Sequence, residues 1–235
     1  MYKIEDLSSY EILIERQDDW WIYTGVHISG KKYGYGLLYH KNFHLFYEGE
    51  FIDNNINGND IIIYFDNGNV EFEGNMVKNS REGFGTEYYW NSNIKYQGEF
   101  KNNGYHGDNV KIYLGEGSLE FEGRYCEGKR QGYGKWYHLN QSLYYAGEFR
   151  NNYIYCNDEL AKTYHSNDML MFQAYFRDNG LKYGHGKAWY KNGKIKYQGN
   201  WDYDCPYNDL VIVYSSDGII KFCQPCKEYR MLWDF

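Results

Sequence analysis

A short aromatic–glycine motif repeats along the chain and constrains its fold more than any other feature of the sequence. In each copy an aromatic residue stands two positions before a glycine, as in Tyr47-Glu-Gly49. The glycine positions are 24, 25, 24, 25, 24, 27 and 25 residues apart, with Ala174 in place of the seventh glycine. This register predicts a repeat protein whose units pack on their neighbours. The anchors are Tyr23, Gly25, Tyr47, Gly49, Phe72, Gly74, Tyr96, Gly98, Phe121, Gly123, Tyr145, Gly147, Phe172, Tyr197 and Gly199.

Each unit is typical of a β-hairpin. Turn formers such as Asn151-Asn152 and Asn67-Gly68 alternate with apolar or aromatic runs. Odd units carry Gly-aromatic-Gly, as in Gly34-Tyr-Gly36, whereas even units carry Asn/Asp pairs such as Asn157-Asp158. We therefore expect an all-β fold, an elongated single-layer solenoid of about eight tandem hairpins in four pairs, each pair about 49 residues long.

The motif also predicts how the units pack. In Tyr47-Glu-Gly49-Glu-Phe51 the two rings and the glycine share one face of a strand, and the glutamates share the other. Glycine weakens a strand unless something packs over the gap it leaves. We expect a ring from the neighbouring hairpin to fill that gap.

The composition fits such an array and argues against other classes of protein. Aromatic residues make up 21% of the chain, and the mean hydropathy is −0.80 with no apolar run near the ~18 residues of a membrane span. The net charge of −7 argues against a nucleic-acid partner. An acidic N-terminal segment without an apolar block is unlike a secretory or transit signal, and five cysteines give no disulfide framework. We expect an intracellular protein, cytoplasmic, cytoskeletal or organellar, neither secreted nor transmembrane.

The pattern Tyr-x-Gly-x-Phe, a short turn, then Gly-x-Gly, at this period, resembles MORN repeats (membrane occupation and recognition nexus). The resemblance covers roughly Tyr23 to Phe222 and is strongest in units such as Tyr96 to Gly107. Even units depart from it, with residues such as Asp60 at the second glycine of Gly-x-Gly. The resemblance implies a twisted single-layer ribbon of hairpins and a role as a scaffold or docking module.

The sequence divides into a leader or cap at 1–22, the repeat array at 23–224 and a docking or capping tail at 225–235. In the leader, alternation around Ile12 and Ile14 favours a strand before the first unit. Even units contain continuous apolar runs, which predict burial on both faces, under a partner or under the chain's own ends. The candidate partner-binding residues are Ile61, Ile63, Leu210, Ile212, Met231, Leu232, Trp233 and Phe235.

No group of residues has the spacing of a catalytic or metal site. Cys223-Gln-Pro-Cys226 favours an incidental thiol pair, with a local disulfide or half a metal site as alternatives. His40 and His138 occupy equivalent repeat positions, which indicates repeat chemistry. We therefore expect no enzyme activity, cofactor or metal.

Two functions remain open. The first is a non-catalytic structural scaffold that binds other protein subunits, or copies of itself, in a larger intracellular assembly such as a ciliary, cytoskeletal or mitochondrial complex of a protist. The alternative is a peripheral module that binds anionic phospholipid through basic clusters such as Lys31-Lys32, Lys129-Arg130 and Lys191 with Lys194 and Lys196.

Overall fold

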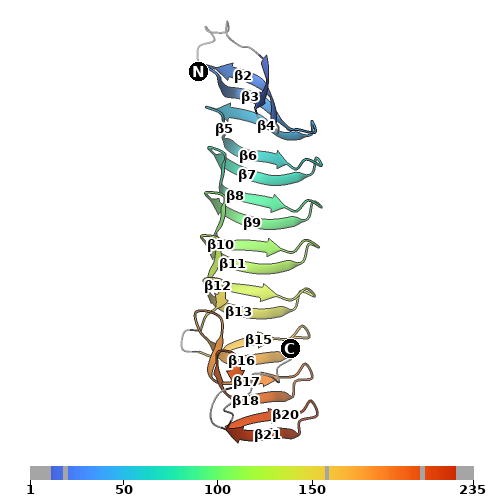
Figure 1. Ribbon diagram of the computed structural model, residues 1–235, viewed down its shortest axis with the longest axis vertical. Coiled ribbons are helices and arrows are strands. Elements are labelled where there is room, and N and C mark those ends of the chain that lie inside the picture. The colour runs from blue at the N-terminus through green and yellow to red at the C-terminus, as the bar shows by residue number, and fades with distance from the viewer. Residues whose placement is uncertain (1–11, 18–20, 157–158, 207–209, 226–235) are drawn as a thin grey trace. The chain divides into compact units, whose positions relative to one another are not determined.

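Antiparallel pairing between strands that follow one another in the chain confirms the predicted all-β class: an antiparallel sheet of sequential hairpins that does not close into a barrel. The computed structural model describes residues 12–17, 21–156, 159–206 and 210–225, and side chains for 23–156, 159–206 and 212–221 (Figure 1). It divides into two compact units, Met1–Gly117 and Ser118–Phe235.

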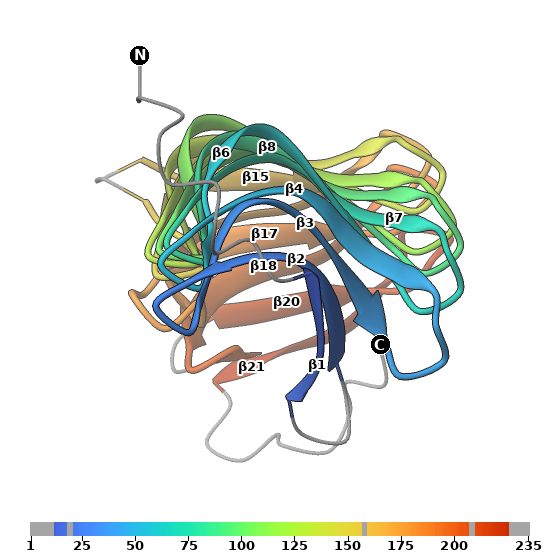
Figure 2. The same ribbon diagram turned by 90° about the horizontal axis from the view of Figure 1, so that it is seen from above.

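In the first unit the strand before the array is present, since β1 pairs with β2 from Ile12–Val26 to Gln17–Trp21. The hairpins β3–β4, β6–β7 and β8–β9 follow and overlie one another when seen from above (Figure 2). The strands are β1 (Ile12–Gln17), β2 (Trp21–Ile28), β3 (Lys31–His40), β4 (Leu45–Ile52), β5 (Asn55–Ile56), β6 (Gly58–Tyr64), β7 (Val70–Val77), β8 (Ser80–Tyr88), β9 (Ile94–Lys101) and β10 (Gly104–Tyr113).

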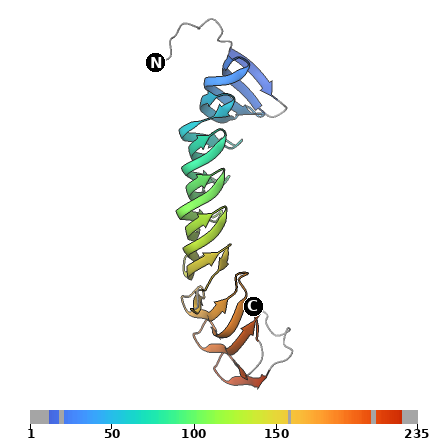
Figure 3. The ribbon, with the colours of Figure 1, turned by 90° about the vertical axis from the view of Figure 1, so that its left-hand side faces the viewer.

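The second unit has the same pattern, in which each strand pairs antiparallel with the next and the hairpins follow one another (Figure 3). Its strands are β11 (Leu119–Cys126), β12 (Lys129–Tyr137), β13 (Leu143–Arg150), β14 (Tyr153–Ile154), β15 (Ala161–Tyr164), β16 (Leu170–Phe176), β17 (Lys182–Trp189), β18 (Ile195–Asp202), β19 (Cys205–Pro206), β20 (Leu210–Tyr214) and β21 (Ile220–Pro225).

The turns at one end of the hairpins use the residue types that the sequence indicates. Asn151 and Asn152 both have positive φ (51° and 76°), the conformation of a type I′ turn. The asparagine side chain also bonds to a neighbouring hairpin, since the Arg130 amide donates to Asn152 Oδ1 at 2.8 Å. Asn54, Asn79 and Asn103 accept a backbone amide in the same way. Asparagine therefore both forms these turns and joins successive hairpins.

The anchor rings form the core. We call the face that carries them the inner face, and the opposite one the outer face. Phe51 packs edge-on against Tyr23 and Tyr47, with centroids 5.0 and 5.3 Å apart. The same arrangement recurs with Phe100, Phe149 and Trp201, each between two anchor rings. Tyr23, Tyr47, Phe72, Tyr96, Phe121, Tyr145 and Tyr197 are buried, whereas Phe172, which precedes Ala174, is half-buried.

The glycine gaps are filled differently from the expectation. A Cβ on Gly49 would lie 2.3 Å from Oη of Tyr47, the ring of its own motif. A Cβ on Gly36, across the pair with Gly25, would likewise meet the Tyr23 ring at 2.5 Å. The prediction that a neighbouring hairpin supplies the ring is therefore wrong. Side-chain atoms of six anchors come within 3.0 Å of the Cβ position of the glycine two residues later: Tyr23, Tyr47, Phe72, Tyr96, Phe121 and Tyr145. Rings of adjacent hairpins pack edge-on against Tyr23, Phe72 and Phe121.

The surroundings of the anchors Phe72 and Tyr96 differ. At Phe72 the cross-strand glycines approach closely, so that a Cβ on Gly74 would lie 2.8 Å from the Gly85 Cα. At Tyr96 the following strand bulges, and the hydroxyl donates to the carbonyls of Glu99 at 2.5 Å and His106 at 3.1 Å. Tyr96 therefore satisfies backbone groups at this bulge, whereas Tyr23 is an anchor at closely approaching glycines, since a Cβ on Gly25 would lie 2.9 Å from the Gly36 Cα.

Candidate interaction surface

Exposed aromatic rings recur on the outer face, once in each of the first three pairs of hairpins. Tyr35, Phe84 and Tyr133 are 59%, 63% and 60% exposed. Each stands between the two glycines of the Gly-aromatic-Gly motif, and the first of these, such as Gly34, has φ near +67°, which glycine adopts without strain. The sequence indicated the glycines as packing residues but gave no sign that the ring between them faces solvent.

The first unit places carboxylates beside these rings. Tyr35 lies opposite Glu50 across the β3–β4 pair, and Phe84 lies opposite Glu99 across β8–β9. The Tyr35 hydroxyl donates to a Glu48 carboxylate oxygen, and this hydrogen bond is the main cause that raises the pKa of Tyr35. Aromatic rings and acidic side chains therefore alternate on this face.

A hollow of about 510 Å³ opens where β4 and β6 part. Among the described residues one Cα pair, Tyr47 with Ile63, joins these strands. On the other side of β6, the register with β7 shifts between Gly58 and Ile61, so the intervening residues bulge. The lining residues are Tyr35, Tyr47, Glu48, Gly49, Glu50, Asn57, Gly58, Asn59, Asp60, Ile61, Ile62 and Tyr64. The Asn59-Asp60 pair that the sequence singles out is thus part of a bulge, and Asp60 has φ +57°.

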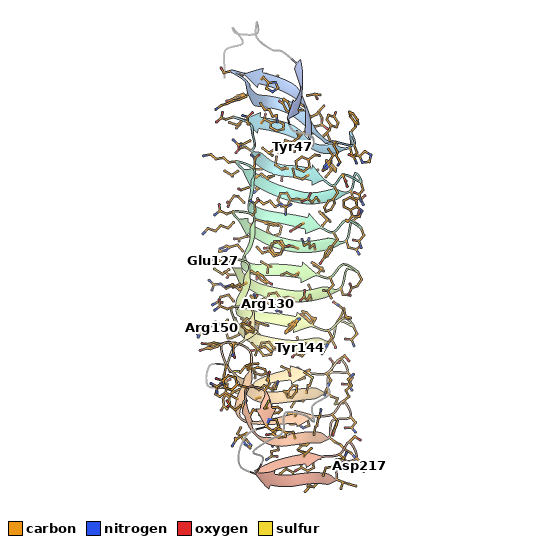
Figure 4. All side chains as sticks on the ribbon, viewed as in Figure 1. Tyr47, Glu127, Arg130, Tyr144, Arg150 and Asp217 are labelled. Carbon is orange, nitrogen blue, oxygen red and sulfur yellow. The ribbon has the colours of Figure 1, made fainter. Side chains whose placement is uncertain are left out.

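Tyr47 reaches this hollow from the inner face, and its position in the first unit is marked in Figure 4. Its hydroxyl donates to the Glu50 carbonyl at 3.1 Å. Burial raises the pKa of Tyr47 to about 12, so the hydroxyl stays protonated at neutral pH. The hollow therefore offers carboxylates, carbonyls and rings, which suit binding of a cation better than general-base chemistry.

The candidate partner-binding residues divide into three groups. Ile61 and Ile63 are buried among the anchor rings (8% and 4% exposed), so the expectation that they contact a partner is corrected: they are core residues. Ile62, between them, is 38% exposed on the outer face, as alternation along a strand requires, so burial of this face under a partner stays a prediction.

In the last hairpin, Ile212 is half-buried and pairs with Cys223, and Leu210 pairs with Pro225, with only its backbone described. Met231, Leu232, Trp233 and Phe235 lie outside the described residues. The Cys223–Cys226 pair likewise falls where side chains are not described, whereas Cys126, Cys156 and Cys205 are free thiols.

A row of cations on the inner face was missed by sequence reasoning. Arg81 stacks over the Phe72 ring at 4.7 Å, and Lys182 lies 4.6 Å from the Phe172 ring. Lys32 over Tyr23 and Arg130 over Phe121 occupy the corresponding places. The sequence did contain a signal for them, since these four basic residues repeat at the spacing of the hairpin pairs. Each contributes a cation–π contact to the core.

The surroundings of the two arginines differ. Arg81 pairs with Glu71 at 2.7 Å and with Glu87 at 3.4 Å. Burial acts to raise the pKa of Glu87, but hydrogen bonds from Lys95 and Tyr105 and the charge of Arg81 outweigh it and lower that pKa.

Arg130, marked in Figure 4, lies 4.5 Å from the Trp136 ring, and its Nε and Nη1 are buried without a hydrogen-bond partner. Three rings, those of Phe121, Trp136 and Phe149, surround the guanidinium.

The basic clusters that favour the lipid alternative are largely engaged within the chain. Lys31 pairs with Asp53, and Lys194 donates to the Asp217 carbonyl at 2.6 Å. Lys32 is buried, and Arg130 points into the rings described above. Their charges are therefore less available to a surface of anionic headgroups than the sequence suggests.

The histidines act as the repeat interpretation predicts. Nε2 of His40 lies 2.9 Å from the Tyr64 carbonyl, and Nε2 of His138 lies 2.8 Å from the Tyr164 carbonyl, which joins successive hairpin tips. In the part of the chain that the structure describes, no group of three His, Cys, Asp or Glu side chains could hold a metal ion. Within the same residues, no helix is long and apolar enough to cross a membrane.

The fold is a long antiparallel sheet of consecutive hairpins, which is compatible with tandem β-hairpin repeats. A comparison with protein-family models finds no match, and a search of curated proteins finds no relative.

Proposed function

We propose that this chain is a non-catalytic scaffold of the MORN-repeat type, a subunit of a larger intracellular assembly that binds other protein subunits through its outer face. The observation that carries the proposal is the exposed ring at one repeat position, Tyr35 and Phe84 in the first unit and Tyr133 in the second. The packing of the repeat needs rings on the inner face, but nothing in that packing needs a large ring in solvent. Exposed apolar rings rimmed by polar residues are typical of interaction sites.

The inner face supports the same proposal. Its anchor positions are filled by rings and by the cations that stack on them, so the repeat leaves the outer face as the surface on which units can differ. The altered pKa values of Glu87 and Tyr47 are explained by burial and by pairing inside the core, whereas the raised pKa of Tyr35 follows from its hydrogen bond with Glu48 on the outer face.

Isolation of the tagged full chain under native conditions tests the proposal. We expect wild type to co-elute with defined subunits in fixed proportion, and the triple variant Tyr35→Ser, Phe84→Ser, Tyr133→Ser to lose them while its circular dichroism stays unchanged. A control with three exposed tip residues changed, Phe43→Ser, Leu139→Ser and Ile219→Ser, should keep them, since these side chains are 65–69% exposed at hairpin tips.

Two results would contradict the scaffold function. One is a wild-type protein that elutes alone as a monomer. The other is salt-sensitive flotation with anionic vesicles in place of protein binding, which would favour the peripheral lipid module instead.

A further inference from the structure

The outer face of the first unit combines apolar and acidic side chains in a regular order. Tyr35 on β3, Ile62 on β6 and Phe84 on β8 are exposed, and they lie opposite Glu50, Glu73 and Glu99 respectively. Four strand-to-strand steps separate β3 from β8, which at about 4.8 Å a step places Tyr35 and Phe84 roughly 19 Å apart. A partner that contacts both must therefore be an extended or helical segment and not a small molecule.

The outer-face carboxylates of the first unit have few cations near them in the part of the chain that the structure describes. Among the described residues, no lysine, arginine or histidine lies within ion-pair distance of Glu48, Glu50 or Glu99. Lys111, opposite Gln97, is a cation on the same face. Through Gly117 the sequence holds 18 Asp and Glu against 10 Lys and Arg, a net charge of −8.

The second unit has a different surface at the equivalent positions. From Ser118 onward it holds 14 acidic and 15 basic residues, a net charge of +1. Lys162 stands where the first unit has Ile62, and Ala146 stands where it has Glu48. The ring is kept at Tyr133, and Glu148 lies opposite it as Glu50 lies opposite Tyr35, but the carboxylate of Glu48 has no counterpart, so the second unit provides an internal control with fewer acidic side chains.

The hollow between β4 and β6 gives this acidic face a specific point of attachment. Glu48, Glu50 and Asp60 line it together with Tyr35 and Ile62, and its volume of about 510 Å³ admits a long side chain. Carboxylates next to a tyrosine ring suit a lysine or arginine, whose charge pairs with the acids while its stem packs on apolar atoms.

We propose that the outer face of the first unit binds a lysine- or arginine-rich segment of a partner protein, with one basic side chain in the hollow and apolar contacts at Tyr35 and Phe84. The proposal rests on the scaffold function above and names the chemistry of its partner. Complementary charge sets orientation and association rate, and the rings provide most of the buried contact.

Fluorescence anisotropy with the full chain and a labelled nonalysine peptide, at 150 mM salt, tests this inference. Glu48→Gln with Glu50→Gln should weaken binding at least tenfold, and Tyr35→Ala at least threefold. The matched control, Glu127→Gln with Glu148→Gln, removes the same charge from exposed positions of the second unit and should weaken binding less than twofold. Unchanged circular dichroism and hydrogen exchange would show that every variant is folded.

Equal loss in the hollow and control variants would overturn the inference, because binding would then follow net charge alone. Absence of peptide binding would overturn it too. Native isolation separates this failure from that of the scaffold function: if the Glu48→Gln, Glu50→Gln variant keeps its native subunits, the scaffold function stands and the basic segment is wrong. If light scattering shows that wild type self-associates and this variant does not, the occupant is a second copy, which also contradicts the proposal.

Discussion

The close approach of the Tyr23 ring to Gly36 leads to a sharp prediction for Gly36→Ala. The backbone at Gly36 lies outside the left-handed region, so alanine is allowed there, and the entire penalty comes from the Cβ. That atom would lie 2.5–2.8 Å from three atoms of the Tyr23 ring. Overpacking of this kind costs about 1–3 kcal/mol.

Hydrogen exchange read by mass spectrometry measures this cost locally, at β2 and β3. A loss of about 1–3 kcal/mol should reduce amide protection roughly 5- to 150-fold in these strands. Gly115→Ala is the control, because a Cβ there meets nothing within 4 Å. It should change stability by less than about 0.5 kcal/mol.

A double-mutant cycle with Tyr23→Leu identifies the cause. Leucine lacks the atoms that meet the new Cβ, so Gly36→Ala should cost much less in that background, with a coupling of at least about 1 kcal/mol. Additive effects, within about 0.5 kcal/mol, would refute the proposed contact between the Tyr23 ring and Gly36.

Three further changes follow from the same structure. Tyr96→Phe removes the donor to the His106 carbonyl at the bulge and should lower the free energy of unfolding by about 1–2 kcal/mol, measured in urea. Asn79→Ala removes the acceptor of the Ile56 amide hydrogen bond (2.7 Å) and places alanine at φ +65°, so it should reduce local amide protection from hydrogen exchange about tenfold. Asn79→Gly should recover the share of this loss that is due to φ, because glycine adopts positive φ without strain. The pKa of Tyr47 is raised from 10 to about 12, so the stability that depends on its protonated hydroxyl is complete below pH 10 and is lost as pH rises through 12. A late phase of phenolate absorbance near pH 12 should therefore shrink in Tyr47→Phe.

Each of these results has an opposite that would contradict the structure. Unchanged stability in Tyr96→Phe would mean that the bulge carbonyl needs no donor. Full protection in Asn79→Ala would remove the asparagine link between hairpins. A wild-type titration that is complete by pH 11 would show that the Tyr47 hydroxyl is not buried.

The sequence predicted the hairpins because turn residues and anchors repeat in one register, and that register reflects local backbone geometry. It did not predict that the Tyr47 ring would lie on its own Gly49, since this depends on how strongly the strand curves. It also led to the expectation that Ile61 and Ile63 contact a partner, whereas both are buried in the core. A run of three isoleucines suggests burial on both faces, but in the chain by itself alternation places Ile62 on the outer face, where it is 38% exposed.

The candidate surface was harder to predict than the core. Core positions are constrained by packing and are therefore similar from one hairpin to the next. The same core motif can thus be recognised several times in one sequence. The outer face is free to vary, and Tyr35 beside Glu48 in the first unit has Tyr133 beside Ala146 as its counterpart in the second. The hollow depends on where β4 and β6 separate, which is a property of the bulge at Gly58 to Asp60.

Zero-length carbodiimide coupling of the native complex, followed by mass spectrometry, tests the scaffold function most directly, because it joins carboxylates to amines in contact. If the outer face of the first unit is the docking surface for a basic partner, cross-links should join Glu48, Glu50 or Glu99 to lysines of another protein, and the Glu127 and Glu148 carboxylates should give few. Native protein that stays monomeric, or that cross-links to its partners through the hairpin tips alone, would contradict it.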